Sequence, residues 1–500
     1  MKKLSIILLA SVVLAGCSKN FFDTNTNPNQ STNASVELVL ANALKVTAQP
    51  QIRGYTFLNA WMGYWVASGS YAINSSDEAS YKETTDFADS KNNIGGIWSG
   101  FYDNLTDYDY IEKTATSTSN YFYIGAAKVM KAYVFQQLVD MFGNIPYGNA
   151  FKSTGNLLPS YDDAKGIYED LAKQLDAAVV SFQRADAVGS PSQDVLFAGN
   201  NQKWAQFANT LKLRLLMRQT QMAGRSAYIQ TEINKITANG SGYLNSDALV
   251  NPGYSNSTDK QNPIFGYCIN TAGTYIQDFW RAAKYPITFC LANNDPRYTS
   301  WYAPIAGGGY VGGILGGNPN GSPNPVGSAL STFSTNTTTG VLKSVSQGAP
   351  LMSAAESYLL QSEAVLRTFI AGNAGNLFNS GVQASFSYLG QGSSAGYTAQ
   401  AGNIQTNYSA CSTDAQRLAC IIRQKWLAFN FTTPFEAWCD YRRLGLPADV
   451  PLSNSILIDQ APPRIPIRVL YPTIEYNTNA ANVASQGTID YHTTKIFWMP

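Results

Sequence analysis

The chain is poor in charge and nearly free of histidine. Of its 500 residues, 13% are Asp, Glu, Lys or Arg, the formal net charge is +1, and His492 is the single histidine. The balanced charge argues against a nucleic-acid partner, because nucleic-acid binders carry a basic stripe or patch. One histidine excludes a His-pair zinc site and weakens every triad that needs histidine as its base. We therefore expect no metal site and no cofactor.

Cysteine is also scarce, and its spacing fits no regular framework. Besides Cys17 there are five cysteines, an odd number, and no C-x-x-C pair occurs. This pattern supports neither a zinc knuckle nor a disulfide scaffold. One pair can still be oxidised outside the cell, and the sequence leaves the pairing open. The five are Cys268, Cys290, Cys411, Cys420 and Cys439.

Long apolar runs are missing except near the N-terminus. Two lysines precede the apolar run Leu4–Leu14, which is too short to span a bilayer and fits a signal peptide. The run leads into Leu-Ala-Gly-Cys17, which resembles a bacterial lipobox. We predict a signal peptide over residues 1–16, a lipid anchor on Cys17 that holds the protein at the outer membrane, and a polar tether over 17–35. The alternative is a soluble exported protein with an incidental cysteine.

Helical periodicity dominates most of the chain. Apolar residues that recur three and four positions apart predict a series of amphipathic helices. A glycine at position 143 is expected to stop the fourth helix, and a serine at position 160 is expected to cap the next. The predicted helices include Ser35–Thr47, Ile52–Ala67, Ile97–Ile111, one within 122–147, one after Ser160, and Trp204–Arg218.

A charge-rich exception runs from Leu418 to Pro447, where two helices are predicted. Its charged residues lie among large aromatics, and an unpaired buried charge costs several kcal/mol. We therefore predict a structural ion-pair cluster that joins the two helices. The alternative is an active site with Glu436 or Asp440 as acid or base. The cluster comprises Arg423, Lys425, Glu436, Asp440, Arg442 and Arg443.

Two glutamates on a later helix could be mistaken for a catalytic pair. Glu356 and Glu363 are seven residues apart, about two helical turns or roughly 10 Å. That separation exceeds the distance between the two carboxylates of a retaining glycosidase. We expect them to pair with arginines, for which Arg214 and Arg218 are candidates.

Several motifs, in the right order along the chain, resemble those of the SusD/RagB family of surface lipoproteins of Bacteroidetes-type bacteria. The resemblance implies a mainly α fold, a tetratricopeptide-like scaffold of helical pairs with an irregular, loop-rich ligand-binding subdomain. On this basis the scaffold covers 36–239, the loop-rich subdomain 240–349, and a C-terminal helical part 350–500. The motifs are Lys131–Tyr147, Trp204–Arg218, Ile421–Pro447, Arg464–Asn477 and Lys495–Trp498.

Composition changes within 240–349, where Ser, Asn and Gly become frequent and a Gly-rich run spans 307–317. No Gly-Lys-Ser/Thr follows, so this run is not a phosphate loop. In the family, this region and the loops after the first helices contact the ligand. Sugar rings stack on aromatic side chains, whereas amides and hydroxyls bind sugar hydroxyl groups. The predicted ligand-binding residues are Tyr71, Tyr81, Tyr275, Trp280, Trp301 and Tyr310.

The resemblance implies a non-catalytic protein that captures oligosaccharides and delivers them to a SusC-like TonB-dependent transporter. An oligopeptide ligand is the alternative within this class. A surface glycoside hydrolase would need two acids in the ligand cleft, and a tetratricopeptide adaptor would bind protein alone. The acids of the candidate loops are Asp77, Glu78, Asp278 and Asp295.

Overall fold

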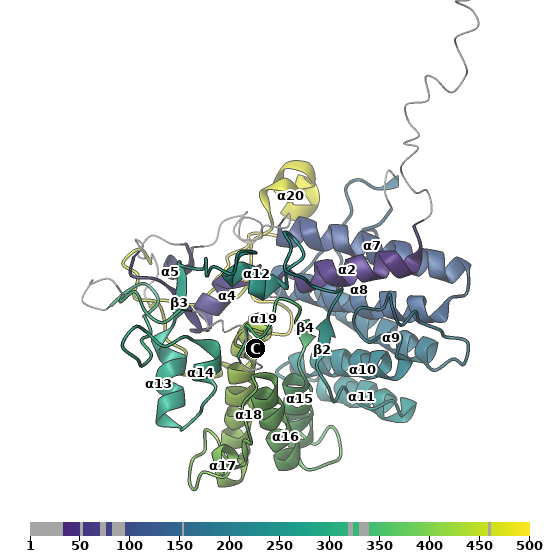
Figure 1. Ribbon diagram of the computed structural model, residues 1–500. Coiled ribbons are helices and arrows are strands. Elements are labelled where there is room, and N and C mark those ends of the chain that lie inside the picture. The colour runs from purple at the N-terminus through teal and green to yellow at the C-terminus, as the bar shows by residue number, and fades with distance from the viewer. Residues whose placement is uncertain are drawn as a thin grey trace, which may run out of the picture.

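The helices of the N-terminal half pack against one another in chain order (Figure 1). The structure is a computed structural model that describes residues 34–50, 54–70, 77–82, 96–152, 155–318, 324–329, 340–458 and 462–500. Each helix of the series contacts the next, so that apolar faces are covered in turn. The series is α2 (Val36–Ala48), α7 (Ile97–Ser117), α8 (Tyr121–Phe142), α9 (Ala164–Phe182), α10 (Asn201–Arg218) and α11 (Ser226–Asn239).

A second group of helices closes on this scaffold from the C-terminal part of the chain. In this group α15 packs on α16, α18 and α10, and α18 leads into α19, which contacts α10 and α4 (Thr56–Trp61). The major helices are α15 (Ala354–Leu366), α16 (Ala374–Tyr388), α18 (Asp414–Phe429) and α19 (Pro434–Leu444). The short ones are α17 (Ala395–Thr398), η3 (Tyr408–Ala410), α20 (Thr473–Thr478) and α21 (Ala480–Ala484).

Two short antiparallel sheets join the loop-rich region to its neighbours. β1 (Trp65–Ala67) pairs with β3 (Trp280–Ala282), and β2 (Ala248–Val250) pairs with β4 (Ala349–Met352). Between the strands lie α12 (Pro263–Cys268), α13 (Lys284–Ala292) and α14 (Tyr298–Trp301). Residues 240–349 therefore share their sheets with flanking segments, and the predicted domain boundaries stay predictions.

Local sequence signals set several helix ends. Gly143 has φ +80° and ends α8, and Gly445, in the left-handed region, ends α19 as predicted. The predicted cap of α9 at Ser160 is wrong. The Asp163 carboxylate caps this helix instead, because it accepts a hydrogen bond from the Gly166 N–H at 2.8 Å.

The helix predicted over Ile52–Ala67 is also wrong. Among the described residues of this range only Thr56–Trp61 is helical, as α4, and the chain then turns into β1. The turn includes Gly63 at φ +73°, a conformation that side chains rarely adopt. Pairing of β1 with β3 outweighs the helical spacing of the aromatic residues, so Trp61 and Trp65 do not share a helix face.

The apolar core runs through both helical groups. All nine tryptophans of the chain are buried in it. Trp498 lies close to the C-terminal end, which Figure 1 marks near α19. The Arg442 guanidinium of α19 is 4.8 Å from its ring centroid. A tryptophan platform on the surface is therefore absent, and any aromatic contact with a ligand has to come from Tyr or Phe.

Candidate ligand-binding site

Three of the six predicted ligand-binding aromatics lie in the core. The exposed fraction is 1% for Tyr81, 5% for Trp280 and 1% for Trp301. The sequence indicated an open loop before Tyr81, but the short helix α5 (Asp77–Ser80) precedes this residue. The Tyr81 hydroxyl accepts a hydrogen bond from the Ser453 N–H at 2.8 Å. At 5% exposed or less, these three side chains pack in the core, and the ligand role predicted for them stays a prediction.

Of the other three candidates, the structure describes two. Tyr71 lies outside the described residues. Tyr275 and Tyr310 are half-buried and pack against the core. Tyr310 meets Tyr298 edge to face, with ring centroids 4.8 Å apart. Tyr275 and Tyr310 are therefore the two partly exposed candidates among the described residues.

The charge cluster of the 418–447 segment is sealed between helices. Lys425 Nζ lies 2.6 Å from Asp440 Oδ2, and Arg443 donates to Asp440 Oδ1 at 2.7 Å. Arg443 also forms a bidentate pair with Glu363 of α15, at 2.5 and 2.8 Å. These contacts join α15, α18 and α19, which is the geometry expected of structural ion pairs.

Glu436 occupies the centre of the same network. One of its oxygens accepts from Arg218, and the other lies 3.4 Å from Arg214. Arg214 in turn donates to Glu356 at 2.7 Å, as predicted. Glu363 also pairs with an arginine, but its partner is Arg443 and not the candidate Arg218, which binds Glu436. Burial alone would raise the pKa of Glu436, but the two arginines outweigh it and hold the pKa at about 2. Such a carboxyl is ionised at neutral pH and has no proton to donate as a general acid.

The remaining two cluster residues bind elsewhere. Arg423 donates to the Tyr285 hydroxyl and pairs with Asp449. Arg442 donates to the carbonyl oxygens of Asp140 and Ile467, at 2.7 and 2.9 Å. Both therefore fix the helices to neighbouring segments.

Asp140 of α8 completes this centre. It is fully buried and lies 3.3 Å from the Arg218 guanidinium. Its carboxylate also accepts hydrogen bonds from the Trp498 indole at 2.7 Å and from the Gln136 amide at 3.0 Å. The Tyr168 hydroxyl is a further donor.

The acids considered for a hydrolase are placed unfavourably for that chemistry. Asp295 is buried and bound by Arg297, whose Nη2 lies 2.7 Å from its Oδ2. Glu78 is buried within α5, whereas Asp77 and Asp278 are exposed. None of these four acids lines the pocket described next.

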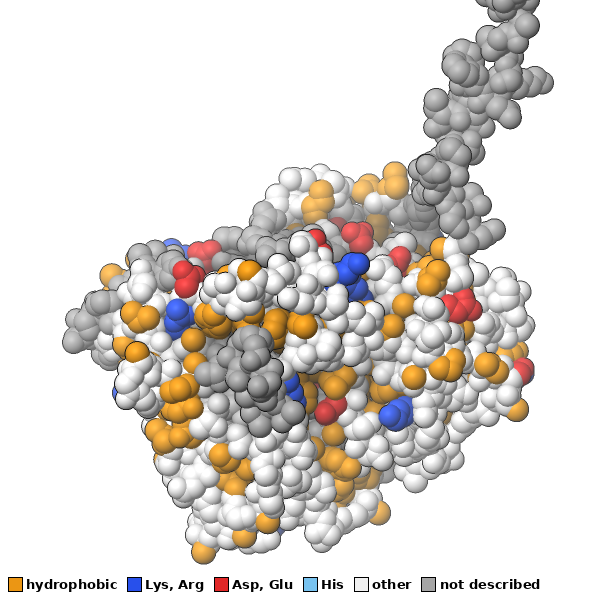
Figure 2. Space-filling model, in the orientation of Figure 1, with side chains coloured by type: hydrophobic (Ala, Val, Ile, Leu, Met, Phe, Trp, Pro, Cys, Tyr) orange, Lys and Arg blue, Asp and Glu red, His pale blue; other side chains and the backbone are white. Residues whose placement is uncertain are grey.

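A polar pocket of about 520 Å³ opens where the loop-rich region meets the end of α2. Among its lining residues, Lys45 is the only cation and Asp259 the only carboxylate. The face of the molecule in Figure 2 shows the same character, with charged side chains scattered singly over a largely uncharged surface. The lining residues are Lys45, Gln49, Tyr254, Thr258, Asp259, Gln261, Pro263, Gly266, Asn270, Thr271 and Ile276.

Side-chain hydrogen bonds hold the loops around this pocket in place. Asn262 caps α12 by accepting from the Ile264 and Phe265 N–H groups, at 3.1 and 3.2 Å. Asn270 closes a turn by accepting from the N–H groups of Ala272 and Thr274, at 3.0 and 2.9 Å. Because these turns are bonded internally, the pocket wall is organised before a ligand arrives.

Tyr254 is the most informative residue of the pocket. It is 5% exposed, and its hydroxyl has no hydrogen-bond partner among the described residues. Burial raises its pKa, so the hydroxyl stays protonated and can donate. A buried hydroxyl without a partner costs about 1–3 kcal/mol, which a ligand oxygen would recover.

Sequence reasoning indicated the region but missed this residue. Tyr254 follows Asn-Pro-Gly, a strong turn signal. The Asn251 side chain accepts from the Gly253 and Tyr254 N–H groups, at 3.1 and 3.4 Å, and so fixes the turn. An aromatic residue next to such a turn could have been found from the sequence, whereas its unpaired hydroxyl could not.

The state of the cysteines and the presence of metal-binding clusters can be stated for the described residues. Cys268, Cys290, Cys411, Cys420 and Cys439 are all buried free thiols in the structure. The described ranges contain no group of three or more His, Cys, Asp or Glu that could hold a metal ion. In the same ranges, no helix combines the length and apolar character that a membrane crossing requires. Cys17 lies outside them.

Solved structures share this fold along nearly its whole length. A SusD-like protein from Bacteroides thetaiotaomicron is 22% identical with a TM-score of 0.73, covering 93% of this chain and 99% of its own. A SusD homologue from Bacteroides uniformis is 23% identical with a TM-score of 0.72, covering 92% and 99%. A chitin-binding SusD homologue from Flavobacterium johnsoniae is 24% identical with a TM-score of 0.74, covering 93% and 98%. The molecule therefore has the mainly helical, tetratricopeptide-like architecture of SusD-like proteins, as predicted.

The sequence places the chain within that class. Residues 28–472 match the SusD-like family described as starch-binding and associating with the outer membrane, and the chain belongs to this family. No curated protein matches the sequence.

Proposed function

We propose that this protein is a cell-surface lipoprotein that captures neutral oligosaccharides and delivers them to a SusC-like TonB-dependent outer-membrane transporter. The polar pocket with its unpaired Tyr254 hydroxyl is the observation that carries the proposal. The family description and the chitin-binding relative support a glycan as ligand.

In the proposed mechanism the ligand is bound and no bond is broken. Tyr254 donates to a sugar oxygen, and the amides of Gln49, Gln261 and Asn270 can each donate to or accept from sugar hydroxyl groups. Lipid on Cys17 and the tether at 17–35 hold the protein at the membrane and allow it to close over the transporter, which then receives the ligand.

The same amides could also bond to the backbone of an oligopeptide, which is the second candidate ligand. Turnover of a glycan is not proposed, because glycoside hydrolysis uses a pair of carboxyl groups and Asp259 is the only one that lines the pocket.

Calorimetric titration of the soluble form that begins after Cys17 tests these statements. The panel contains neutral oligosaccharides, such as chito- and malto-oligosaccharides, and oligopeptides, and each sample is then assayed for products. We expect saturable binding of an oligosaccharide without turnover. Binding of peptides alone would replace the ligand class, and product formation would refute the non-catalytic role.

A further inference from the structure

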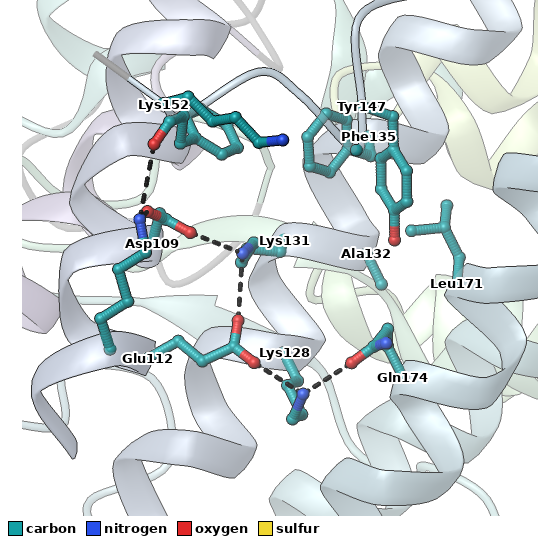
Figure 3. Close-up of a pocket in the computed structure, with 13 residues that line it drawn as sticks. Asp109, Glu112, Lys128, Lys131, Ala132, Phe135, Tyr147, Lys152, Leu171 and Gln174 are labelled. Atoms are coloured by element: carbon teal, nitrogen blue, oxygen red, sulfur yellow. Dashed lines mark hydrogen bonds and ion pairs between the residues drawn. The ribbon is translucent and has the colours of Figure 1, made fainter. Parts of the chain in front are cut away.

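A second pocket, of different chemistry, lies on the helical scaffold. It has a volume of about 410 Å³ and is enclosed by α7, α8, α9 and the loop that follows α8 (Figure 3). This volume falls within the range of roughly 300–1,000 Å³ typical of small-molecule sites. None of its lining residues belongs to the polar pocket around Tyr254.

The pocket has an excess of positive charge. Four lysines line it, against the two carboxylates of Asp109 and Glu112. A third carboxylate, Asp170, lies behind the wall and accepts from the Tyr147 hydroxyl at 2.6 Å. Asp162 also accepts from the Tyr147 and Gly148 N–H groups at 2.9 Å, so the excess of cations holds for the lining residues, which are four lysines and two carboxylates.

Three of the lysines, Lys113, Lys128 and Lys131, form a cluster fixed by ion pairs, the lysine cluster. Glu112 bridges Lys128 at 2.6 Å and Lys131 at 3.0 Å, while Asp109 pairs with Lys131 at 3.0 Å and Lys113 at 2.6 Å. Burial lowers the pKa of Lys131, but Glu112 and Asp109 outweigh it and raise the pKa, so the group stays charged. The lysine cluster therefore holds ammonium groups in place before a ligand arrives.

Lys152 is the unmatched cation. Its ammonium group donates to the Asn149 side-chain oxygen at 2.5 Å and has no carboxylate partner among the described residues. Figure 3 shows its amino group reaching across the pocket toward Tyr147 and Phe135. An anion in the pocket would meet Lys152 on one side and the lysine cluster on the other.

An aromatic wall completes the pocket. Phe135 meets Tyr147 edge to face, with ring centroids 4.7 Å apart, and Phe151 lies 6.1 Å from Phe135. Aromatic walls accept the apolar C–H faces of sugar rings. An anionic group and a C–H face occur together in a sugar acid.

We propose that this pocket binds a hexuronic acid residue of an acidic glycan. The carboxylate of the sugar acid binds Lys152 together with the lysine cluster, and the sugar ring packs against Phe135 and Phe151. The volume of about 410 Å³ favours a single sugar ring over an acidic peptide, which needs an extended groove. This site is separate from the neutral-sugar pocket and does not depend on it.

The test compares trigalacturonate with galactotriose, which has the same ring stereochemistry but no carboxylate, by calorimetry on the mature protein. We expect only trigalacturonate to depend on Lys152. Lys152→Ala should weaken its binding by roughly tenfold, the effect of losing one hydrogen bond to a charged group, and Lys152→Arg should retain most of it. Lys203→Ala is the matched control, because Lys203 is also exposed and has no ion-pair partner among the described residues. Added salt should weaken trigalacturonate binding.

Four outcomes would overturn the proposal. They are undetectable binding of trigalacturonate at millimolar concentration, equal affinity for both trisaccharides, and loss of trigalacturonate binding in Tyr254→Phe but not in Lys152→Ala. The fourth is tighter Lys152-dependent binding of inorganic phosphate or of an acidic peptide. None of these four outcomes decides the neutral-glycan proposal, which the calorimetric panel described above tests separately.

Discussion

Two groups of charges in this charge-poor chain differ in access to solvent. The sealed centre around Glu436 and Asp440 leaves side chains at most 6% exposed, whereas the bridged carboxylates and lysines of the scaffold pocket are 14–21% exposed at Asp109, Glu112, Lys128 and Lys131. The cations of the sealed centre are mainly arginines, whereas the cations of the scaffold pocket are all lysines. The planar fork of arginine satisfies two oxygens at once, which suits a buried pair, whereas lysine is a hydrated point charge.

The difference separates two uses of charge. In the sealed centre, each of the carboxylates Glu363, Glu436 and Asp440 has a cation within ion-pair distance, so its contribution is to the fold. In the open pocket a cation, Lys152, is left over, so the site is suited to an incoming anion. Pairing, more than the presence of charge, distinguishes a structural cluster from a candidate binding site.

The largest effect is expected from breaking the sealed centre. Glu363→Ala leaves the Arg443 guanidinium without its bidentate partner, and removal of one member of a buried pair costs about 3–5 kcal/mol. The free energy of unfolding in urea measures this loss. The exposed pair Arg184–Asp186 provides the control, since Asp186→Ala should leave the unfolding midpoint unchanged. Equal effects of the two variants would contradict the distinction.

Acid should weaken the sealed centre next. A glutamate has a pKa of about 4.3 in the unfolded chain, and that of Glu436 is about 2 in the folded protein. A depressed carboxyl pKa stabilises the fold above the unfolded value, and the contribution is lost as pH falls through the folded value. We expect unfolding free energy to fall by roughly 3 kcal/mol between pH 5 and pH 2 from this group. Constant stability across this range, measured by denaturant titration, would refute the assignment.

A smaller effect is expected in the neutral pocket. Tyr254→Phe should weaken oligosaccharide binding by about 0.5–1.5 kcal/mol, the net value of one hydrogen bond. It should not destabilise the free protein, because the hydroxyl lacks a partner there. Tyr243→Phe is the matched control: its hydroxyl is also buried and unpaired but lines a different pocket between α11 and α16. Equal loss of affinity in both variants would remove Tyr254 from the site.

The smallest change in stability should come from the open pocket. Glu112→Gln removes the carboxylate that bridges Lys128 and Lys131, and partly exposed ion pairs contribute about 0.2–1 kcal/mol. The same variant leaves Lys131 paired with Asp109 and Lys128 bonded to Gln174, and it should bind trigalacturonate more tightly because one negative charge is removed from the pocket. Thermal unfolding and calorimetry together measure the two signs. A large loss of stability would show that these charges serve the fold as the sealed ones do.

Sequence motifs predicted the family, the helical class and most of the long helices. They succeeded where signals are local, as at Gly143 and Gly445, or where pairing is compulsory, as at Glu356 and Glu363. The prediction failed at Ile52–Ala67, because pairing with β3, more than two hundred residues away, decides that segment.

The ligand-binding residues were predicted less well for a related reason. Trp280 and Trp301 have the right chemistry for sugar stacking, but burial depends on contacts that no local pattern records. The pocket around Tyr254 does lie within the indicated range 240–349, and it also uses Lys45 and Gln49 from α2. Composition located the region, whereas only the folded arrangement selects the side chains.

The bond between Trp498 and Asp140 has a consequence for the order in which the protein matures. Its two partners are separated by 358 positions in the chain. During synthesis, α8 emerges long before the Trp498 indole that donates to its buried carboxylate. The N-terminal helices therefore stay short of one donor until the last segment arrives. A chain interrupted before Trp498 would lack this donor and would leave Asp140 with Arg218, Gln136 and Tyr168 as its partners.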